Sequence, residues 1–224
     1  MQKKFKNIRA VFFDAGNTLI YPDYLFIQEV LAEYGLAIDL AKIRAAEYHA
    51  KAAVHKTNSS KPWNIYFGTW FEAVGAKKDD LPTIFNKLWQ RHRQKNLWSR
   101  LDEDVIETLT ELKKRKYASG VISNSDGRLA KLLAELALSK YLDVIVDSEQ
   151  IGLRKPDAGI FEFALDQLNV TPHTALYVGD MYDVDVLGAQ KAGLTPILFD
   201  PLDKLSHITC LKITCLKQLL DMLP

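Results

Sequence analysis

The sequence predicts an α/β fold, in which a doubly wound parallel sheet carries one inserted, all-helical domain. Short apolar runs rich in β-formers alternate with amphipathic helical stretches through the second half of the chain. This alternation is typical of a parallel sheet covered by helices on both faces. About a hundred residues separate the first two apolar runs, where a strand–helix–strand crossover needs only about thirty. An inserted domain is the simplest explanation of that gap.

Five apolar runs are predicted to form the strands of the sheet. They are residues 10–13, 118–122, 143–146, 175–178 and 196–199. The helices predicted between the later strands are residues 127–137, 157–168 and 184–192. Gly193 ends the last of these helices. The connectivity predicts a Rossmann-like catalytic core formed by residues 1–21 and 101–224.

The remaining segment, residues 22–100, is predicted to be a cap domain of helices only, because it shows helical patterns and no strand pair. Its predicted helices run from Asp23 as N-cap to a stop at Gly35, then over 39–54, 62–74 and 80–94. The aromatic side chains Trp63, Tyr66, Phe67, Trp70 and Phe71 fall mostly on one helical face. This pattern favours the packed core of a helical bundle over a substrate-binding surface.

Composition excludes several classes of partner. The 224 residues include 29 basic and 28 acidic side chains, which give a formal net charge of +1. A balanced charge of this kind provides no field that would attract nucleic acid or an anionic membrane. The apolar run after the basic N-terminus is broken at Asp14 and is too short for a signal or membrane-spanning segment. We therefore expect a cytoplasmic protein, a monomer or a dimer, in which Cys210 and Cys215 are buried thiols.

Polar motifs follow the predicted strands at the sheet edge where ligands bind in open α/β folds. They are Asp14 and Thr18 after the first strand, Ser123-Asn124 after the second, Lys155-Pro156-Asp157 ahead of a helix, and Gly179-Asp180 with Asp183 and Asp185 after the fourth. Each motif alone is weak, because Asp, Ser and Lys are common in turns and on solvated loops. Four of them in order at strand ends or helix starts are much more specific.

In these four motifs, which together cover the core, the sequence resembles the haloacid dehalogenase (HAD) superfamily. The insert lies between the first two motifs, as in the members of that superfamily with a helical cap. The resemblance implies a hydrolase that attacks a phosphorylated small molecule. Asp14 would be the covalent nucleophile and Lys155 the catalytic cation. Ser123, Asn124 and Thr18 would bind the substrate.

The resemblance also implies a Mg²⁺ site at the same strand ends. Its ligands would be Asp14, Asp180 and the backbone carbonyl of Gly16, with Asp185 as the second acid of the fourth motif, orienting metal-bound water. The chemistry requires such a cation, because a carboxylate that attacks an anionic phosphate needs its charge neutralised. Oxygen ligands of this kind suit Mg²⁺.

One position departs from the superfamily pattern. Phosphatases of the superfamily carry an Asp two residues after the nucleophile, where it protonates the leaving group, and this chain has Gly16. Loss of a general acid commonly costs about 10²- to 10⁴-fold in rate. Asp126 or Asp183 would be the alternative proton carriers. The next residue, Asn17, is the non-glycine type that best tolerates a left-handed backbone, so we expect the loop to keep its shape.

The leading functional hypothesis is therefore a Mg²⁺-dependent phosphatase that works through an aspartyl-phosphate. The alternative from another class is a weakly active or non-catalytic member that binds a phosphorylated ligand or a protein through its cap. A dehalogenase or phosphonatase is less favoured, because dehalogenases of the superfamily use no metal and typically have no Gly-Asp at the fourth motif, where this chain has Gly179-Asp180 with Asp185. Cap lysines neither support nor exclude the amine chemistry of a phosphonatase.

Overall fold

The computed structural model describes residues 5–55 and 62–224. The chain forms two compact units. The sheet unit comprises residues 1–21 and 101–224, and the helical unit comprises residues 22–100. Within the described ranges, no helix has the length and apolar character needed to cross a membrane.

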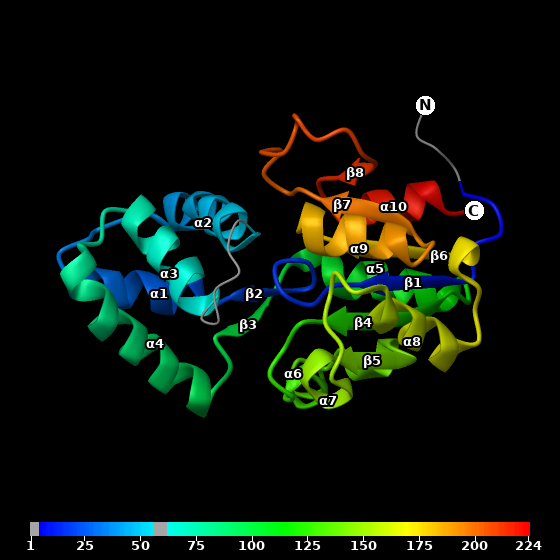
Figure 1. Cartoon of the computed structure of the whole chain (residues 1–224), viewed down its shortest axis with the longest axis horizontal. Coiled ribbons are helices and arrows are strands. Elements are labelled where there is room, and N and C mark those ends of the chain that lie inside the picture. The colour runs from blue at the N-terminus through cyan, green and yellow to red at the C-terminus, as the bar shows by residue number, and fades with distance from the viewer. Residues whose placement is uncertain (1–4, 56–61) are drawn as a thin grey trace. The chain divides into compact units, whose positions relative to one another are not determined.

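A six-stranded parallel sheet forms the centre of the sheet unit, with the strand order β5-β4-β1-β6-β7-β8 (Figure 1). The strands are β1 Ala10–Phe13, β4 Ala118–Ser123, β5 Val144–Asp147, β6 Ala175–Gly179, β7 Thr195–Phe199 and β8 Lys212–Ile213. At the centre of the sheet, Phe13 of β1 lies between Val121 of β4 and Val178 of β6. Because the central strands are parallel, their carboxyl ends meet at one edge. The doubly wound α/β fold that the sequence predicts is confirmed.

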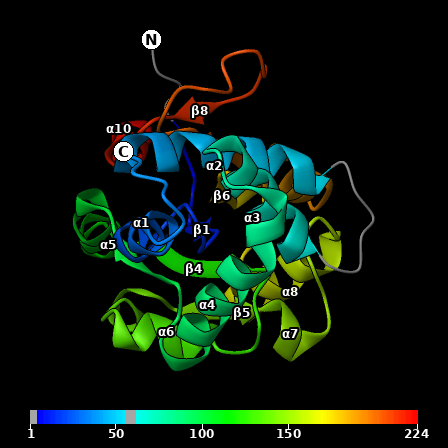
Figure 2. The ribbon, with the colours of Figure 1, turned by 90° about the vertical axis from the view of Figure 1, so that its left-hand side faces the viewer.

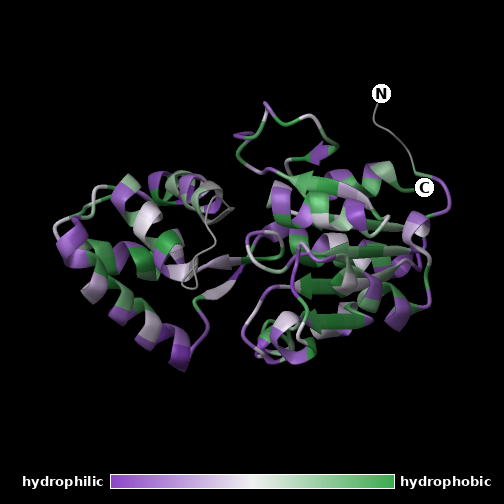
Figure 3. Cartoon of the chain, in the orientation of Figure 1, coloured by the Kyte–Doolittle hydropathy of each residue, from purple (hydrophilic) through white to green (hydrophobic). Residues whose placement is uncertain are grey.

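Helices cover this sheet, and the strands themselves are almost continuously hydrophobic (Figure 3). The helices of the unit are α5 Glu103–Lys114, α6 Leu129–Glu135, α7 Ser148–Ile151, α8 Ala158–Leu168, α9 Leu187–Lys191 and α10 Lys217–Met222. Helices α8 and α9 bury one face of the sheet through a cluster that includes Phe12, Ile160, Phe161 and Tyr177. Continuous apolar runs of this kind are expected where both faces of a parallel sheet are covered.

Two features of the sheet unit differ from the prediction. Strand β8 pairs with β7 at the sheet edge, although only Lys212 and Ile213 take part, and the sequence pattern does not reveal it. The helix predicted over 184–192 begins with a π-helical turn, η4 Tyr182–Val186, before α9. Such turns are rare and occur often at functional sites.

In the described part of the helical unit, the α-helices are α1 Tyr24–Ala32, α2 Leu40–His55, α3 Pro62–Ala73 and α4 Leu81–Gln94. Helices α2 and α3 pack side by side (Figures 1 and 2). Trp70 and Phe71 of α3 are fully buried among aliphatic residues of the other helices, and Tyr66 is nearly so. Trp63 is the exception, with 52% of its surface exposed. The aromatic run therefore forms the core of a helical bundle, as its spacing predicts.

A short strand pair lies where the chain enters and leaves the helical unit, although the sequence shows no strand pair there. Strand β2, Ile20–Pro22, pairs with β3, Trp98–Leu101. Asp23 takes the N-cap position of α1, but its side chain makes no capping hydrogen bond. Instead, it accepts hydrogen bonds from Nε and Nη2 of Arg100 at 3.1 and 3.0 Å.

Candidate active site

Asp14 lies directly beyond β1, at the carboxyl edge of the sheet, and is 8% exposed. Its backbone N–H donates to the carbonyl of Val178 at 2.8 Å, which ties the start of the loop to the neighbouring strand β6. The loop then turns back on itself, because the amide of Ile20 donates to the carbonyl of Ala15. Asn17 has φ 58°, so the left-handed backbone expected at this position is confirmed.

Asp180 and Asp185 lie at the same edge of the sheet, in the segment that follows β6, the strand that pairs with β1. Asp180 follows β6 at once, and Asp185 reaches back from the π-helical turn. Gly179 makes this approach possible, because a Cβ atom there would lie 2.4 Å from Cγ of Asp185. One carboxylate oxygen from each of Asp14, Asp180 and Asp185 lies within 4.8 Å of the others, and all three residues are buried.

Lys155 reaches this group from the loop ahead of α8. Its Nζ donates to Oδ1 of Asp14 at 2.5 Å and to Oδ1 of Asp185 at 2.7 Å, and its side chain is only 2% exposed. When all four groups are ionised, three carboxylates and one ammonium leave a formal charge of −2. A buried charge excess of this size requires a compensating cation or proton.

The pKa of Asp14 reflects its burial first and the neighbouring charges second. Burial raises it from its ordinary value of 3.8 to about 7, Lys155 opposes that shift, and the negative charges of Asp185 and Asp180 add to it. Burial lowers the pKa of Lys155, but Asp14 and Asp185 raise it by more, so the ammonium stays charged. The site thus combines a permanent cation with carboxylates whose ionised forms need a second positive partner.

Tyr177 is a member of this group that the sequence analysis misses. It lies in the middle of β6, is fully buried, and accepts a hydrogen bond from Nζ of Lys155 at 2.8 Å. Its hydroxyl also lies 3.0 Å from Oδ1 of Asp185. A tyrosine within an otherwise apolar buried strand is the signal in the sequence, because a buried hydroxyl needs a polar partner.

The predicted substrate-binding residues take different positions. Asn124 uses both ends of its amide on the backbone of Lys155: Nδ2 donates to the carbonyl and Oδ1 accepts from the amide, each at 2.9 Å. Its side chain therefore positions the Lys155 loop. Ser123 ends β4 and is buried. Thr18 is fully buried in the loop after β1, and its Oγ1 has no partner in the described part of the chain.

The groups considered for proton transfer are placed as follows. Gly16 lies in the tight turn after Asp14, where it forms a bridge with Ile20. Asp126 is ion-paired with Arg128, whose Nη2 lies 2.5 Å from its Oδ2. Asp183 is exposed on the π-helical turn.

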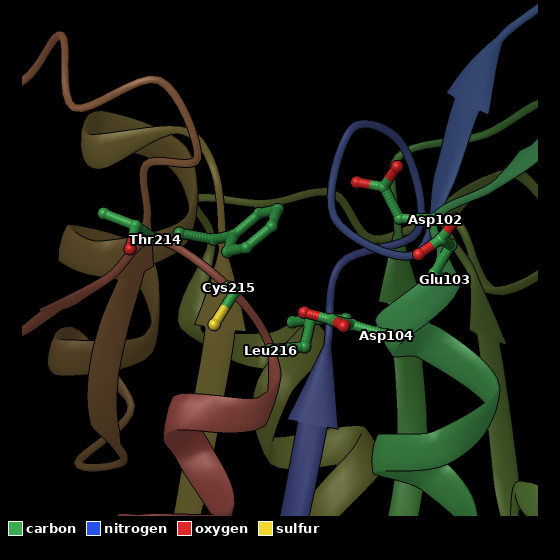
Figure 4. Close-up of a pocket in the computed structure, with 7 residues that line it drawn as sticks. Asp102, Glu103, Asp104, Thr214, Cys215 and Leu216 are labelled. Carbon is green, nitrogen blue, oxygen red and sulfur yellow. The ribbon is translucent and has the colours of Figure 1, made fainter.

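A separate cavity of about 290 Å³ in the sheet unit involves none of these residues (Figure 4). It is lined by Asp102, Glu103, Asp104, Phe199, Thr214, Cys215 and Leu216. Its acidic wall is the first turn of α5, where negative side chains interact favourably with the helix dipole. Lys217 also pairs with Asp104 at 3.4 Å. The helix itself thus accounts for these charges.

Comparison with known proteins identifies a family and relatives that match most of this chain. The family model described as haloacid dehalogenase-like hydrolase matches residues 8–193. The haloacid dehalogenase-like hydrolase domain-containing protein 3 of Xenopus laevis is 34% identical over 147 residues, which are 64% of this chain and 59% of that protein. The glyceraldehyde 3-phosphate phosphatase of Methanopyrus kandleri is 28% identical over 198 residues, which are 85% of this chain and 83% of that protein.

Solved structures share the fold. The crystal structure of the HAD-hydrolase YfnB from Bacillus subtilis, bound to magnesium, matches with a TM-score of 0.70 and 18% identity, over 97% of this chain and 99% of that chain. At this identity, the likeness concerns the fold alone. The family model extends from the strand that leads to Asp14 to the segment beyond Asp185, and the same four motifs converge at one edge of the sheet. The chain therefore belongs to the haloacid dehalogenase-like hydrolase family.

Proposed function

We propose that this hydrolase is a Mg²⁺-dependent phosphatase that acts on a phosphorylated small molecule through an aspartyl-phosphate on Asp14. The observation that supports this proposal is the buried group of Asp14, Asp180 and Asp185, in which Lys155 contacts Asp14 and Asp185. The phosphatase name of the Methanopyrus kandleri relative supports the choice of a phosphate ester as the substrate class.

A divalent cation suits this group in charge and in ligand type. Its two positive charges would cancel the formal −2 of the ionised site, and carboxylate oxygens are the ligands that Mg²⁺ prefers. Asp14, Asp180 and the Gly16 carbonyl would hold the ion. Asp185 accepts hydrogen bonds from Lys155 and, at 2.9 Å, from the amide of Met181, so its role would be to orient Lys155 and metal-bound water. A bound Mg²⁺ would supply charge neutralisation at the phosphate.

Asp14 performs the covalent step. Its carboxylate oxygen forms a bond to phosphorus while the bond from phosphorus to the ester oxygen breaks, and the leaving group departs with the bonding electrons. Water then attacks the phosphorus, which releases inorganic phosphate and restores the carboxylate. Lys155 holds Oδ1 of Asp14, which fixes the orientation of the nucleophile. Thr18, whose Oγ1 has no partner in the described part of the chain, and the buried Ser123 at the end of β4 would bind the phosphate oxygens.

The replacement of the usual acid by Gly16 narrows the substrate class further. Without a carboxyl at this position, the leaving group must depart as an anion unless it carries its own proton. Substrates with acidic leaving groups, such as acyl or aryl phosphates, fit this site best. Residues 1–21 and 101–224 would then act as the catalytic domain, and residues 22–100 as the cap domain that selects among such substrates.

The experiment is a screen of phosphorylated metabolites with Mg²⁺, joined to trapping with beryllofluoride, which mimics a phosphoryl group on an aspartate. We expect hydrolysis and trapping that are suppressed by EDTA, restored by Mg²⁺, and abolished in Asp14→Asn. Asp180→Ala should weaken the response to Mg²⁺. Asp221→Asn, at an exposed carboxyl of α10, is the matched control and should behave as the wild type.

The alternative functions correspond to distinct results. Binding of a phosphorylated ligand with no turnover in any substrate would establish the non-catalytic alternative. Full activity in excess EDTA would contradict the metal site and point to metal-free, dehalogenase-like chemistry. Turnover that persists in Asp14→Asn would eliminate the covalent mechanism.

A further inference from the structure

The hydroxyl of Tyr177 is the uncharged one of the three oxygens that accept hydrogen bonds from the Lys155 ammonium. The ammonium of Lys155 has three hydrogens, and three oxygens accept them: Oδ1 of Asp14 at 2.5 Å, Oδ1 of Asp185 at 2.7 Å and Oη of Tyr177 at 2.8 Å. Each donor thus has one acceptor in the protein. The tyrosine completes the set, so the rotation of the ammonium about its last bond is fixed.

The backbone explains why a tyrosine at this position reaches Lys155. Side chains alternate along a strand, so Tyr177 and Gly179 share one face of β6. Gly179 has no side chain, and Asp185 packs directly against it. The hydroxyl at the end of the Tyr177 side chain therefore meets Asp185 and Lys155 above its own strand.

The tyrosine ring is itself held in place. It packs edge to face against Phe161 of α8, with centroids 5.0 Å apart. Its hydroxyl lies 3.2 Å from the carbonyl of Ile122 and 3.0 Å from Oδ1 of Asp185, and its single proton serves one of these acceptors. The ring thus links three elements of the sheet unit, β4, β6 and α8, to the ammonium.

We propose that Tyr177 is a positioning residue for Lys155, which it holds against the nucleophile Asp14. This inference rests on the proposed function for its kinetic consequence, but the hydrogen bond itself does not. Without the hydroxyl, one ammonium hydrogen loses its acceptor in a buried site, and the ammonium becomes free to rotate away from Asp14. The charge on the nucleophile is then less well balanced during attack on a phosphate.

Tyr177→Phe tests the proposal, because it removes the hydroxyl and keeps the ring against Phe161. We expect kcat to fall about tenfold with little change in KM, since the lost contact orients a catalytic group and does not touch substrate. In a Lys155→Met background, the same change should alter the single-turnover rate less than twofold. The matched control is Tyr117→Phe, whose hydroxyl donates to the carbonyl of Pro224 in an exposed position, and it should leave kcat unchanged.

A second measurement is independent of activity. With ¹⁵N-labelled lysine, the wild-type ammonium of Lys155, assigned by its absence in Lys155→Met, should exchange its hydrogens with water slowly, because all three are bonded and buried. Tyr177→Phe should accelerate this exchange about tenfold, and Tyr117→Phe should not. Fast exchange in the wild type would overturn the proposal even if Tyr177→Phe failed to fold.

The remaining results separate this inference from the proposed function. A wild type that hydrolyses no phosphate ester contradicts the proposed function, while the exchange measurement still decides the role of Tyr177. An active wild type with an equally active Tyr177→Phe variant and unchanged exchange overturns the inference alone. If Tyr177→Phe lowers the rate equally in the wild-type and Lys155→Met backgrounds, Tyr177 has a purely structural role, and this result also overturns the inference.

Discussion

At the scale of single residues, the raised pKa of Asp14 makes metal binding depend on pH. The proton and the cation compete for one carboxylate, so Mg²⁺ binds the deprotonated form. With a pKa of about 7, Mg²⁺ affinity should fall about 30-fold at pH 5.5, which lies 1.5 units below that value, and level off above pH 8. Titration calorimetry at several pH values measures this change.

The same pKa predicts a trend in the stability of the metal-free protein. The folded state holds the Asp14 proton more tightly than the unfolded chain, so stability decreases as pH rises from the ordinary 3.8 through about 7. Asp14→Asn has no such proton and is the control for both effects. A Mg²⁺ affinity that is flat between pH 5.5 and 8 would show that Asp14 is ionised throughout, or is no ligand.

Gly16 leads to a second residue-scale prediction. Rates for a series of phosphate esters should depend steeply on the pKa of the leaving group, with aryl and acyl phosphates cleaved far faster than alkyl phosphates. Gly16→Asp should flatten this dependence and raise the alkyl phosphatase rate by about 10- to 100-fold. Circular dichroism must confirm that the variant folds. A shallow dependence in the wild type would reveal an existing proton donor, and exposed Asp183 would be the first to replace.

Whether the sequence reveals a residue of the site depends on where that residue lies in its strand or loop. Asp14, Asp180, Asp185 and Lys155 are polar residues at strand ends or beside a helix start, and the structure brings all four together. Tyr177 escapes the motif analysis because it lies inside a strand and reaches the site only through the length of its side chain. A strand pattern identifies the face of a residue, but not which loop covers that face.

At the scale of elements, the buried carboxylate of Asp147 at the end of β5 organises the loop that follows β4. It accepts hydrogen bonds from the backbone amides of Gly127, Leu129 and Glu149, at 3.2, 3.1 and 3.0 Å. Asp147→Ala leaves these donors without an acceptor, and we expect a loss of about 3 kcal/mol in the free energy of unfolding. Because the same loop directly follows Ser123, KM for the phosphorylated substrate should rise as well.

Denaturant unfolding and steady-state kinetics measure these two effects. Asp157→Ala is the control, because the Asp157 side chain also caps a helix but accepts a hydrogen bond from one amide, that of Gly159 at 3.1 Å. This substitution should lower the free energy of unfolding by about 1 kcal/mol. Asp147→Asn keeps one acceptor oxygen and should be intermediate. Equal losses for Asp147→Ala and Asp157→Ala would mean that the loop does not depend on the additional hydrogen bonds.

The length of a helix or strand decides whether the sequence pattern reveals it. The predicted strand over 10–13 agrees with β1, and the helix predicted over 157–168 begins one residue early, at the Asp157 cap. Strand β8 has two residues, too few for an alternation to be visible. Strands β2 and β3 are also short, and their pairing joins segments almost eighty residues apart. Local patterns carry no information on such a contact.

At the scale of the whole molecule, each of the two units has its own hydrophobic core, and the tryptophans report on the core of one unit. All four lie in the helical unit: Trp63, Trp70, Trp89 and Trp98. Trp70 is fully buried in the core of that unit. The three carboxylates and Lys155 all belong to the sheet unit. Tryptophan fluorescence therefore follows one unit, while a ligand at the candidate site stabilises the other.

We predict that the two units unfold as separate steps, because each buries its own hydrophobic cluster. Mg²⁺ with beryllofluoride at 100 times its dissociation constant should stabilise the sheet unit by about 2.7 kcal/mol. In urea, the ligand should shift the part of the circular dichroism transition that comes from the sheet unit to higher urea concentration. The midpoint of the tryptophan fluorescence transition, which follows the helical unit, should stay unchanged. Asp14→Asn, which cannot form the beryllofluoride adduct, should show no shift with either probe. If both probes gave one coincident transition that moved with the ligand, the helical and sheet units would unfold as a single cooperative body, and changes in the cap would then affect the stability of the catalytic residues directly.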